Sequence, residues 1–369
     1  MSHTRIRSCH VHDFRNYQEL HCDCDASFIV FTGSNGAGKT NILEALSLLS
    51  QGKGFRSARP EEQLRIGAQH GWSVQAEIAT PITTHYISTG VTTGAQKRRV
   101  LINDAPASQH DMSDIVDILW FLPTTSHLFS ENSTAQRKYF DRMVCGFDRE
   151  HAKRIYSYEH YMRERNKLLM MRADALWMAS LEQKMAEYSV AIASARLDMV
   201  AHINESSALV SDAFPHARLE LIGDAETLLQ HHTALHTESA IRDMLEHARV
   251  RDAQTKRASH GAHKSRFSVY YTAKNMVAHQ CSTGEQKALL MTLLLAQIYA
   301  QTRWNQRAPV LLLDEMVAHL DEHRRAVLFE VLSDAQIQCF ATGTDRASFH
   351  ALNAYDTKHY IIQDGRILM

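Results

Sequence analysis

The chain has 369 residues, of which 44% are apolar, a formal net charge of −1 and an isoelectric point of about 7.1. This length accommodates two domains, or one large domain with an insertion, and the apolar fraction supports a sizeable core. The near-neutral charge excludes a globally cationic nucleic-acid binder, so any contact with nucleic acid needs a local basic surface.

The sequence predicts a soluble, cytosolic protein. Its first residues lack an apolar signal segment, and the most hydrophobic stretch, Ala288 to Ala300, is too short and too interrupted to span a bilayer. The six cysteines form no paired C-x-x-C sets, which favours reduced thiols. His21, Cys22 and Cys24 offer at most part of a metal site, and the 23 histidines show no metal-binding spacing.

Two predicted strands lead into a phosphate-loop motif. Residues 4–14 and 28–32 are rich in β-branched and aromatic residues, and the second run ends at Gly33. The motif GSNGAGKT follows, and the apolar helix NILEALSLLS comes after it, which is the context that the motif requires. The predicted nucleotide-binding residues of this loop are Gly33, Ser34, Asn35, Gly36, Ala37, Gly38, Lys39 and Thr40.

The residue types of this loop suit the binding of a nucleotide. The glycines let backbone N–H groups approach the phosphates of ATP, and Lys39 neutralises charge on the β- and γ-phosphates. Thr40 places a hydroxyl on Mg²⁺. We therefore expect ATP and Mg²⁺ to be the cofactors.

The middle of the chain changes from strands to helices. Residues 72–102 read as short strands of an antiparallel β-lobe beside the nucleotide site. From Ser133 to Asp212 prolines and glycines are absent apart from Gly146, and charged residues interleave with Leu, Met and Tyr, which predicts nearly continuous helix.

A heptad pattern marks one apolar face of this helical region. The residues that recur every seven positions are Met171, Met178, Met185, Ile192 and Met199. Such a seam packs against another helix. We favour a neighbouring helix of the same subunit, and an intermolecular coiled coil is the alternative.

The C-terminal third returns to alternating strands and helices. Residues 213–260 read as mixed helix and loop, and 267–280 as a strand pair. The helix that starts at CSTGEQ, the strand VLLLDE, a helix at 321–334 and the strand IQCFAT follow. We therefore predict an α/β fold, an ABC-type phosphate-loop ATPase head with a parallel-core sheet and an antiparallel β-lobe. Its halves are 1–132 and 261–369, and a helical arm, 133–260, is inserted between them.

The strand Val310 to Leu313 ends in two carboxylates at the switch point of the predicted sheet. Asp314 is expected to hold Mg²⁺ through water, and Glu315 to orient or deprotonate the attacking water. Solvated acids at a strand end are the alternative. Because Lys39 and the phosphate loop occur in the same chain, we favour ATP hydrolysis with Lys39, Asp314 and Glu315 as the catalytic residues.

A second anion-binding pattern lies at residues 281–286, CSTGEQ, where N–H groups and a hydroxyl precede an apolar helix. It resembles the signature motif of the ATP-binding-cassette superfamily, with Ser282 and Gly284 retained and Thr283 in place of the first glycine. This resemblance implies that the segment caps the γ-phosphate held by the other subunit of a dimer. Met316 to Asp321 then corresponds to the D-loop, with Asp321 at the dimer interface.

The narrower resemblance is to the RecF family of bacterial recombination and repair ATPases. DFRNY (13–17) resembles the family's NFRNY, MRERNKLL (162–169) resembles its R-N-x-L-L helix, and the phosphate loop and the spacing from CSTGEQ to LLLDE also fit. The resemblance runs nearly end to end. It implies a head like that of structural-maintenance-of-chromosomes proteins and a short helical arm.

The same resemblance implies a function. A RecF-like protein dimerises with ATP on single-stranded, duplex or junction DNA, and cooperates with RecO and RecR to load RecA at single-strand gaps and stalled forks. One segment departs from the family pattern: in GAHKSRF (261–267), Ala262 replaces a proline and Arg266 replaces an acid.

Two other functions remain as alternatives. The ATP-binding subunit of a membrane transporter would carry a switch histidine where this chain has ATGTD (341–345), and a glutamine near Leu122. A chromosome-associated protein with long coiled-coil arms would need a longer insertion, because a helix rises only about 1.5 Å per residue. Both alternatives fit less well than a repair ATPase.

Clusters of basic residues are the candidates for contact with DNA phosphates. The longest, in residues 249–266, consists of Arg249, Arg251, Lys256, Arg257, Lys264 and Arg266. Further candidates are Arg56, Arg59, Lys97, Arg98 and Arg99. A solvated surface is the alternative reading of each cluster.

Overall fold

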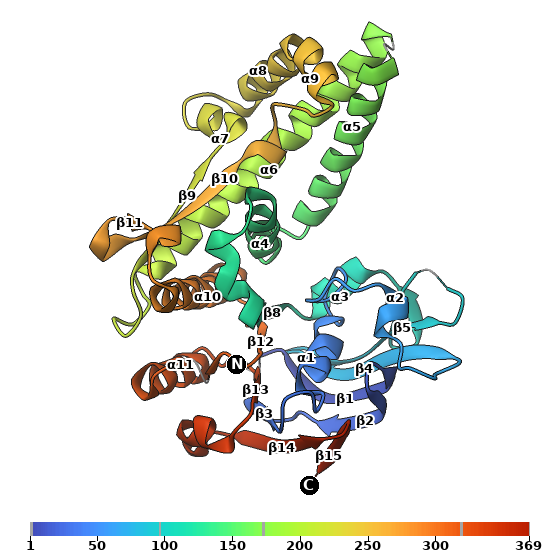
Figure 1. Ribbon diagram of the computed structural model, residues 1–369, viewed down its shortest axis with the longest axis vertical. Helices are drawn as coiled ribbons and strands as arrows, with labels where there is room; N and C mark the ends of the chain where they lie inside the picture. The colour runs from blue at the N-terminus through green and yellow to red at the C-terminus, as the bar shows by residue number, and fades with distance from the viewer. Residues whose placement is uncertain (1–2, 96, 172–173, 318–319, 369) are drawn as a thin grey trace. The chain divides into compact units, whose positions relative to one another are not determined.

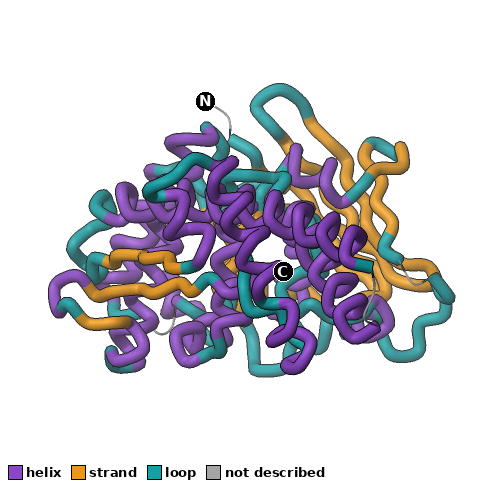
Figure 2. The backbone as a smooth tube through the Cα atoms, turned by 90° about the horizontal axis from the view of Figure 1, so that it is seen from above, coloured by secondary structure: helices purple, strands orange, loops and turns teal. Residues whose placement is uncertain are grey.

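The structure is a computed structural model that describes residues 3–95, 97–171, 174–317 and 320–368. The chain forms two compact units: Met1–Thr125 with Gln301–Met369, and Ser126–Ala300. The arm that we predicted for 133–260 lies within the second unit, which also includes the segment up to Ala300. Strands gather into three sheets among the described residues, and helices account for much of the remaining backbone (Figure 2).

A six-stranded sheet forms the core of the first unit, in the order β15-β14-β3-β13-β12-β8 (Figure 1). Its strands are β3 (Phe28–Thr32), β8 (Ile118–Phe121), β12 (Val310–Leu313), β13 (Cys339–Gly343), β14 (Thr357–Gln363) and β15 (Arg366–Leu368). Neighbours are parallel except for β14 and β15, which are antiparallel. Strands from both ends of the chain therefore share one sheet, and the predicted parallel core is confirmed.

The second sheet of this unit is antiparallel, in the order β2-β1-β4-β5-β6-β7. Its strands are β1 (Arg5–Phe14), β2 (Tyr17–Asp23), β4 (Gly71–Ala79), β5 (Thr84–Thr92), β6 (Arg99–Ile102) and β7 (Ala105–Ala107). The β-lobe predicted for 72–102 corresponds to β4, β5 and β6. Strand β2 was not predicted, because the tight turn after β1 relies on left-handed conformations at Asp13 and Arg15.

The helices of the first unit are α1 (Lys39–Ser47), α2 (Pro60–Gln63), α3 (Gln109–Ile115) and α11 (Glu322–Asp334). Buried side chains of α1, such as Leu43 and Leu46, pack in one cluster with Val11 of β1 and Phe31 of β3. The amide of Gln338 joins the two halves of the chain, because it donates to the carbonyl of Ile6 at 2.8 Å and accepts from its N–H at 2.7 Å.

The second unit is mainly helical. Its helices are α4 (Ser133–Cys145), α5 (His151–Met171), α6 (Ala175–Ser207), α7 (Asp224–Leu229), α8 (Ala234–His247), α9 (Arg249–Thr255) and the start of α10 (Thr283–Asn305). A three-stranded antiparallel sheet, in the order β11-β10-β9, consists of β9 (Ala217–Ile222), β10 (Arg266–Tyr271) and β11 (Met276–Val277). The predicted strand pair at 267–280 is confirmed, whereas β9 was not predicted.

The heptad seam divides between two helices. Met178, Met185, Ile192 and Met199 lie buried in α6, where Met185 and Ile192 pack in one core with Tyr158 of α5. This confirms packing within the subunit. The inclusion of Met171 was wrong: it ends α5 and is 64% exposed. A new helix starts there because the Asp174 carboxylate accepts the N–H of Leu176 at 2.9 Å and caps α6.

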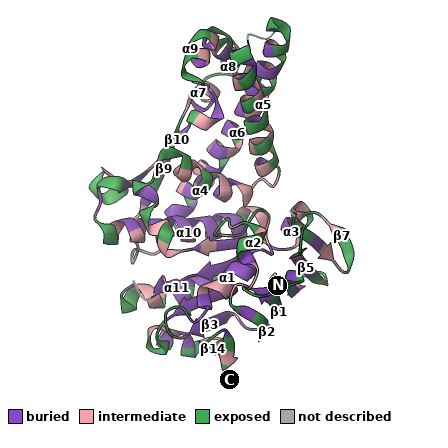
Figure 3. Ribbon diagram, turned by 45° about the vertical axis from the view of Figure 1, so that its right-hand side comes forward, coloured by how far each residue is buried: buried purple, intermediate pink, exposed green. Residues whose placement is uncertain are grey.

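The most hydrophobic stretch of the sequence is a buried helix. Residues 288–300 belong to α10, which is buried along most of its length (Figure 3). Among the described residues, no helix combines the length and the apolarity needed to cross a membrane. The part of the chain that the structure describes also contains no group of three or more His, Cys, Asp or Glu side chains suited to a metal ion. His21 is exposed on β2, whereas Cys22 is buried on its other face.

Candidate nucleotide site

The predicted phosphate loop connects β3 to α1. All five residues of β3 are buried, so the strand fixes the start of the loop in the middle of the sheet. The buried ammonium group of Lys39 turns back over the loop and donates to the carbonyls of Gly33 at 2.8 Å and Ser34 at 2.9 Å. The loop therefore encloses a cation at the N-terminus of a helix, an arrangement that attracts phosphate.

A carboxylate at the end of β12 meets two hydroxyls, one from α1 and one from β13. Asp314 follows β12, and its Oδ1 accepts a hydrogen bond from the Thr40 hydroxyl at 2.9 Å. It also accepts one from the Thr342 hydroxyl at 2.7 Å. Sequence reasoning missed Thr342, although it lies within the segment ATGTD. Its position at the end of a predicted strand could have identified it, because β13 is parallel to β12 and Leu313 pairs with Ala341, the residue before Thr342.

Glu315 adopts a left-handed backbone conformation, with φ 54°. Such a conformation is uncommon for residues other than glycine and costs on the order of 1–3 kcal/mol, so it persists only where the surroundings enforce it. Its N–H donates to the Thr342 hydroxyl at 2.9 Å. The turn leaves the carboxylate partly exposed, with Oε1 at 3.9 Å from Lys39 Nζ.

The turn of DFRNY supports the phosphate loop from outside. Asn16 donates from Nδ2 to the carbonyl of Ala37 at 3.2 Å, and its Oδ1 accepts from Asn41 of α1 at 2.8 Å. Gly38, with φ 113°, is required because a Cβ there would collide with the side chains of Asn16 and Tyr17. The family motif at 13–17 thus has a structural role beside the predicted site.

A buried carboxylate anchors the same turn to α1. Glu44 is fully buried and accepts hydrogen bonds from Arg15 Nε at 2.9 Å and from Arg56 Nη1 at 2.7 Å. Arg56 also donates to Asn41 at 2.8 Å. Two cations compensate the one buried charge, which makes this network a rigid support beneath the loop.

The predicted signature segment begins α10 in the second unit. Ser282 and Glu285 form a capping arrangement, in which the Ser282 hydroxyl donates to Glu285 Oε2 at 2.8 Å. The hydrogen bond from Lys274, followed by those from Ser282, lowers the pKa of Glu285 to about 2. Ser282, Thr283 and Gly284 are exposed, and a Cβ at Gly284 would meet no atom within 4 Å. Packing within this chain therefore does not require the glycine.

Asp321 caps the next helix. Its Oδ1 accepts the N–H of Arg324 at 2.8 Å, and this bond is the main cause of a lowered pKa of the carboxyl group. The predicted D-loop runs from Met316 to Asp321, and its residues 318–319 lie outside the described residues.

The structure divides the predicted basic candidates by their partners. Arg249 is held by Glu182, with Nε at 3.0 Å from Oε1, and Arg98 donates to the Leu48 carbonyl at 2.8 Å. Burial lowers the pKa of Arg98 to about 10. These two guanidinium groups, together with that of Arg56, serve intramolecular contacts. In contrast, Arg257, Lys264 and Arg266 are exposed and make no ion pair with any residue that the structure describes.

The fold and the site together define a class of protein. A parallel core sheet with a phosphate loop after β3 and paired carboxylates after β12, joined to an antiparallel β-lobe, is an ABC-type phosphate-loop head. The chain belongs to the RecF family, because the family described as RecF/RecN/SMC N terminal domain matches residues 5–361 and close relatives in sequence are RecF proteins.

Sequence relatives cover nearly the whole chain. The DNA replication and repair protein RecF of Rhizobium rhizogenes is 42% identical over 346 residues, which is 92% of each chain. The protein of the same name from Brucella suis is 39% identical over 368 residues, covering 98% of this chain and 95% of that one.

Solved structures show the same fold. The recombination mediator protein RecF with ATP, from the RecFOR pathway, superimposes with a TM-score of 0.87 at 20% identity, covering 99% of both chains. An Smc head domain of Pyrococcus furiosus with an extended coiled coil superimposes with a TM-score of 0.57 at 14% identity, covering 99% of this chain and 96% of that one.

Proposed function

We propose that the chain is a DNA-binding ATPase of recombinational repair. In this proposal it dimerises on DNA with ATP and, with RecO and RecR, helps to load RecA at single-strand gaps and stalled forks. The observation that carries the ATPase activity is the cluster of Lys39, Thr40, Asp314, Glu315 and Thr342 around the phosphate loop. The names of the relatives support the role in replication and repair.

The loop from Gly33 to Thr40 is the proposed phosphate cradle. Its backbone N–H groups and the N-terminus of α1 favour negative charge, and the Lys39 ammonium is already positioned above the loop. These groups bind the phosphates, and recognition of the adenine base depends on other contacts.

Mg²⁺ is the proposed second cofactor. The Thr40 hydroxyl and the Asp314 carboxylate lie 2.9 Å apart, and oxygen donors of these types suit this ion. When bound, Mg²⁺ would neutralise charge on the phosphate oxygens. Thr342 orients Asp314 for this role by binding the same carboxylate oxygen.

Glu315 is the proposed base for the attacking water. Its carboxylate is partly exposed, so it can accept a proton from a water molecule, and its backbone is fixed by Thr342. Lys39 at 3.9 Å lies on the side where the phosphates are expected, which places a cation next to the developing charge.

The signature segment supports a shared site in a dimer. Ser282, Thr283 and Gly284 present an exposed helix start, and the open space at Gly284 suits close approach by a ligand or another backbone. We propose that this surface, with Asp321, faces the nucleotide held by a second copy of the chain.

Replacing Glu315 with Gln tests the hydrolytic mechanism. The variant should bind ATP but lose multiple-turnover hydrolysis by about 10²–10⁴-fold, since a neutral amide cannot accept the proton. Dimers should accumulate in ATP, as measured by light scattering. The matched control is Glu322→Gln, an exposed acid in the first turn of α11 that should keep wild-type turnover. Undiminished hydrolysis by Glu315→Gln would refute the assignment of the base.

The DNA-dependent part of the proposal has its own measurement. ATP turnover and binding should be compared without DNA and with single-stranded, duplex and gapped DNA. A repair ATPase should bind at least one of these in an ATP-dependent way, whereas no binding to any of them would contradict this function.

A further inference from the structure

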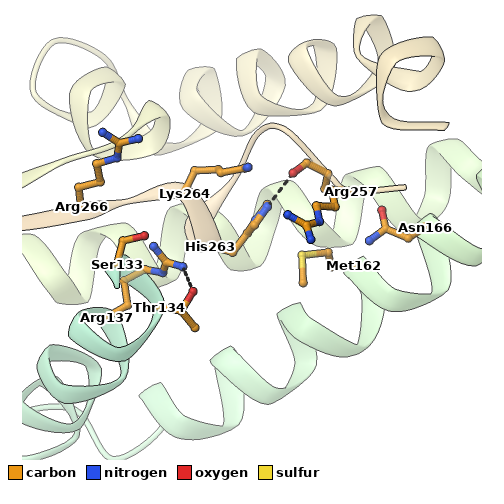
Figure 4. Close-up of a pocket in the computed structure, with 10 residues that line it drawn as sticks. Ser133, Thr134, Arg137, Met162, Asn166, Arg257, His263, Lys264 and Arg266 are labelled. Atoms are coloured by element: carbon orange, nitrogen blue, oxygen red, sulfur yellow. Dashed lines mark hydrogen bonds between the residues drawn. The ribbon is translucent and has the colours of Figure 1, made fainter. Parts of the chain in front are cut away.

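The second unit contains a basic pocket of about 410 Å³ between α4, α5 and residues 257–266 (Figure 4). Arg137 contributes from α4, and Arg257, Lys264 and Arg266 contribute from a segment more than a hundred residues later in the chain. Among the described residues that line this pocket, none is Asp or Glu. The lining thus gathers four cations without an acidic side chain.

The charge of these cations remains available to a ligand. Arg257, Lys264 and Arg266 make no ion pair within the described part of the chain, although Arg249 in the same basic stretch is paired with Glu182. Arg137 is half-buried and donates to the Ser265 carbonyl at 3.2 Å and to the Thr134 hydroxyl at 3.0 Å. Burial, and then the nearby Arg196, lower its pKa, so an anion beside Arg137 would relieve an unfavourable charge.

The pocket also has neutral hydrogen-bonding groups. Ser133 and Thr134 lie at the first turn of α4, where the helix dipole favours negative charge. The amide of Asn166 reaches the same space from α5, and its buried Oδ1 has no hydrogen-bond partner among the described residues (Figure 4). The hydroxyls of Ser133 and Thr134 can donate to an anion in this space.

The loop of residues 257–264, which carries Arg257 and Lys264, is held in place by hydrogen bonds. Tyr158 OH lies 2.6 Å from Nδ1 of His263, and Nε2 of the same ring lies 2.9 Å from the Ala258 carbonyl. Both ring nitrogens are therefore engaged, and burial lowers the pKa of His263 to about 4, so the ring stays neutral. Arg196 donates to the Ala262 carbonyl at 2.7 Å from α6. The neutral His263 thus fixes the loop through its two hydrogen bonds, and Arg257 and Lys264 lie on the same loop.

Glycine is required at one position of this loop. Gly261 has φ 114°, and a Cβ there would collide with Tyr158 OH. The segment GAHKSRF (261–267), which departs from the family pattern at Ala262 and Arg266, therefore has a fixed conformation, and its Lys264 and Arg266 line the pocket.

We propose that this pocket binds backbone phosphates of a nucleic-acid strand, an inference that rests on the proposed DNA-binding function. Guanidinium groups bind phosphate oxygens in pairs, and three of the four cations are arginines. No aromatic side chain is among the described lining residues other than the engaged His263, so bases would not stack there. The pocket is the size of a small-molecule site and not of a duplex, so it would admit adjacent backbone phosphates of one strand.

The test uses a double variant, Arg257→Ala with Lys264→Ala. Binding of a fluorescein-labelled oligothymidylate, and of a duplex of the same length, is measured by anisotropy in ATP over a range of salt concentrations. Removing two phosphate contacts should lower the slope of log K against log salt by about 1.4 for the single strand, since each contact contributes about 0.7. Arg257→Lys with Lys264→Arg should keep the wild-type slope.

A matched control separates the pocket from general charge. Arg163→Ala with Lys167→Ala removes the same charge from exposed positions of α5, but neither residue lines the pocket or belongs to the basic clusters that are candidates for contact with DNA. This control should keep the wild-type slope. If both double variants weaken binding equally, or if neither does while the wild type binds DNA, the pocket is not the phosphate site and the proposed function still stands.

Other ligands are distinguished with the same variants. Inorganic phosphate and thymidine monophosphate are tested as competitors at the same phosphate concentration as the oligothymidylate. If either displaces the oligothymidylate, the pocket binds free phosphate, and the proposal of a nucleic-acid strand is refuted. Polyglutamate is tested in the same way. If it binds more tightly than the oligothymidylate, and the Arg257→Ala/Lys264→Ala variant no longer binds it, the ligand of the pocket is an acidic protein segment and the proposal is refuted. Absence of DNA binding by the wild type would overturn the proposed function together with this inference.

Discussion

Asp314 shows how neighbouring hydroxyls determine the properties of one site residue. Its Oδ1 accepts from Thr40 and from Thr342, and the Thr342 hydroxyl also accepts the N–H of Glu315. A single threonine side chain therefore holds both predicted acids. Orienting contacts of this kind to metal-binding carboxylates contribute strongly to affinity and activity.

Replacing Thr342 with Val removes the hydroxyl and keeps the shape. We expect ATP turnover to fall by about 10–100-fold, because Asp314 and the Glu315 backbone lose their shared partner. The Mg²⁺ concentration needed for half-maximal turnover should rise as well. Steady-state assays over a Mg²⁺ titration measure both effects.

Thr89→Val is the matched control for this substitution. Thr89 is also buried, and its hydroxyl donates to the Arg99 carbonyl at 3.0 Å, but it lies on β5 outside the site. Its Mg²⁺ dependence should equal that of the wild type. Equal behaviour of the two variants would show that Thr342 contributes only to folding.

At the scale of elements, one arginine joins the helices of the second unit. Arg165 of α5 is fully buried and lies within the motif MRERNKLL. Its guanidinium donates to Glu182 of α6 at 3.0 Å, to Asp252 of α9 at 2.8 Å and to the Leu245 carbonyl of α8 at 2.6 Å. Four helices are thus fixed around one cation, and packing explains the arginine of the motif.

Arg165→Met should lower the free energy of unfolding of this unit by about 3–5 kcal/mol, because Asp252 would remain buried without its cation. Chemical denaturation followed by circular dichroism measures the change. Lys167→Met, an exposed position on the same helix, should change it by less than about 0.5 kcal/mol. A stability of Arg165→Met equal to that of the Lys167 variant would show that the network contributes little.

At the scale of the whole molecule, the two anion-binding motifs raise the question of how subunits share a site. The phosphate loop has its own cation in Lys39. In the signature segment, by contrast, Ser282 and Gly284 are exposed, and a Cβ at Gly284 would meet no atom of this chain within 4 Å. If the signature acts on the partner's ATP, defects in the two motifs should complement each other between subunits.

Mixing Lys39→Met with Ser282→Arg tests this arrangement. Each parent dimer has two defective sites, but a mixed dimer has one site built from an intact loop and an intact signature. Random equal mixing makes half of the dimers mixed, so ATP turnover should return to about a quarter of the wild-type value if the sites are independent.

Two further measurements make this result decisive. Subunit exchange is verified by energy transfer between labelled subunits, and Ser282→Arg alone is assayed for ATP binding and for ATP-dependent dimerisation. A variant that binds ATP normally and stays monomeric agrees with a signature that faces the partner. A Ser282→Arg protein that dimerises normally, with no recovery in the exchanged mixture, would contradict the shared site.

The sequence by itself determined the parts of this protein whose chemistry is contained in consecutive residues. GSNGAGKT and VLLLDE predicted the phosphate loop and the strand with its acids, and the pattern of apolar and charged residues predicted the helices of residues 133–212. These predictions succeed because each motif specifies its own local conformation. The family resemblance followed from the same segments.

Only the tertiary structure decided which distant side chains become partners. Thr342 reaches Asp314 because β13 lies parallel to β12, and Arg137 joins Lys264 because α4 packs beside the loop after α9. Arg249 counted as a DNA candidate in the sequence, yet it is engaged by Glu182 from another helix. A run of charges does not reveal these pairings, because the strength of an ion pair depends on burial and distance, which only the packed chain fixes.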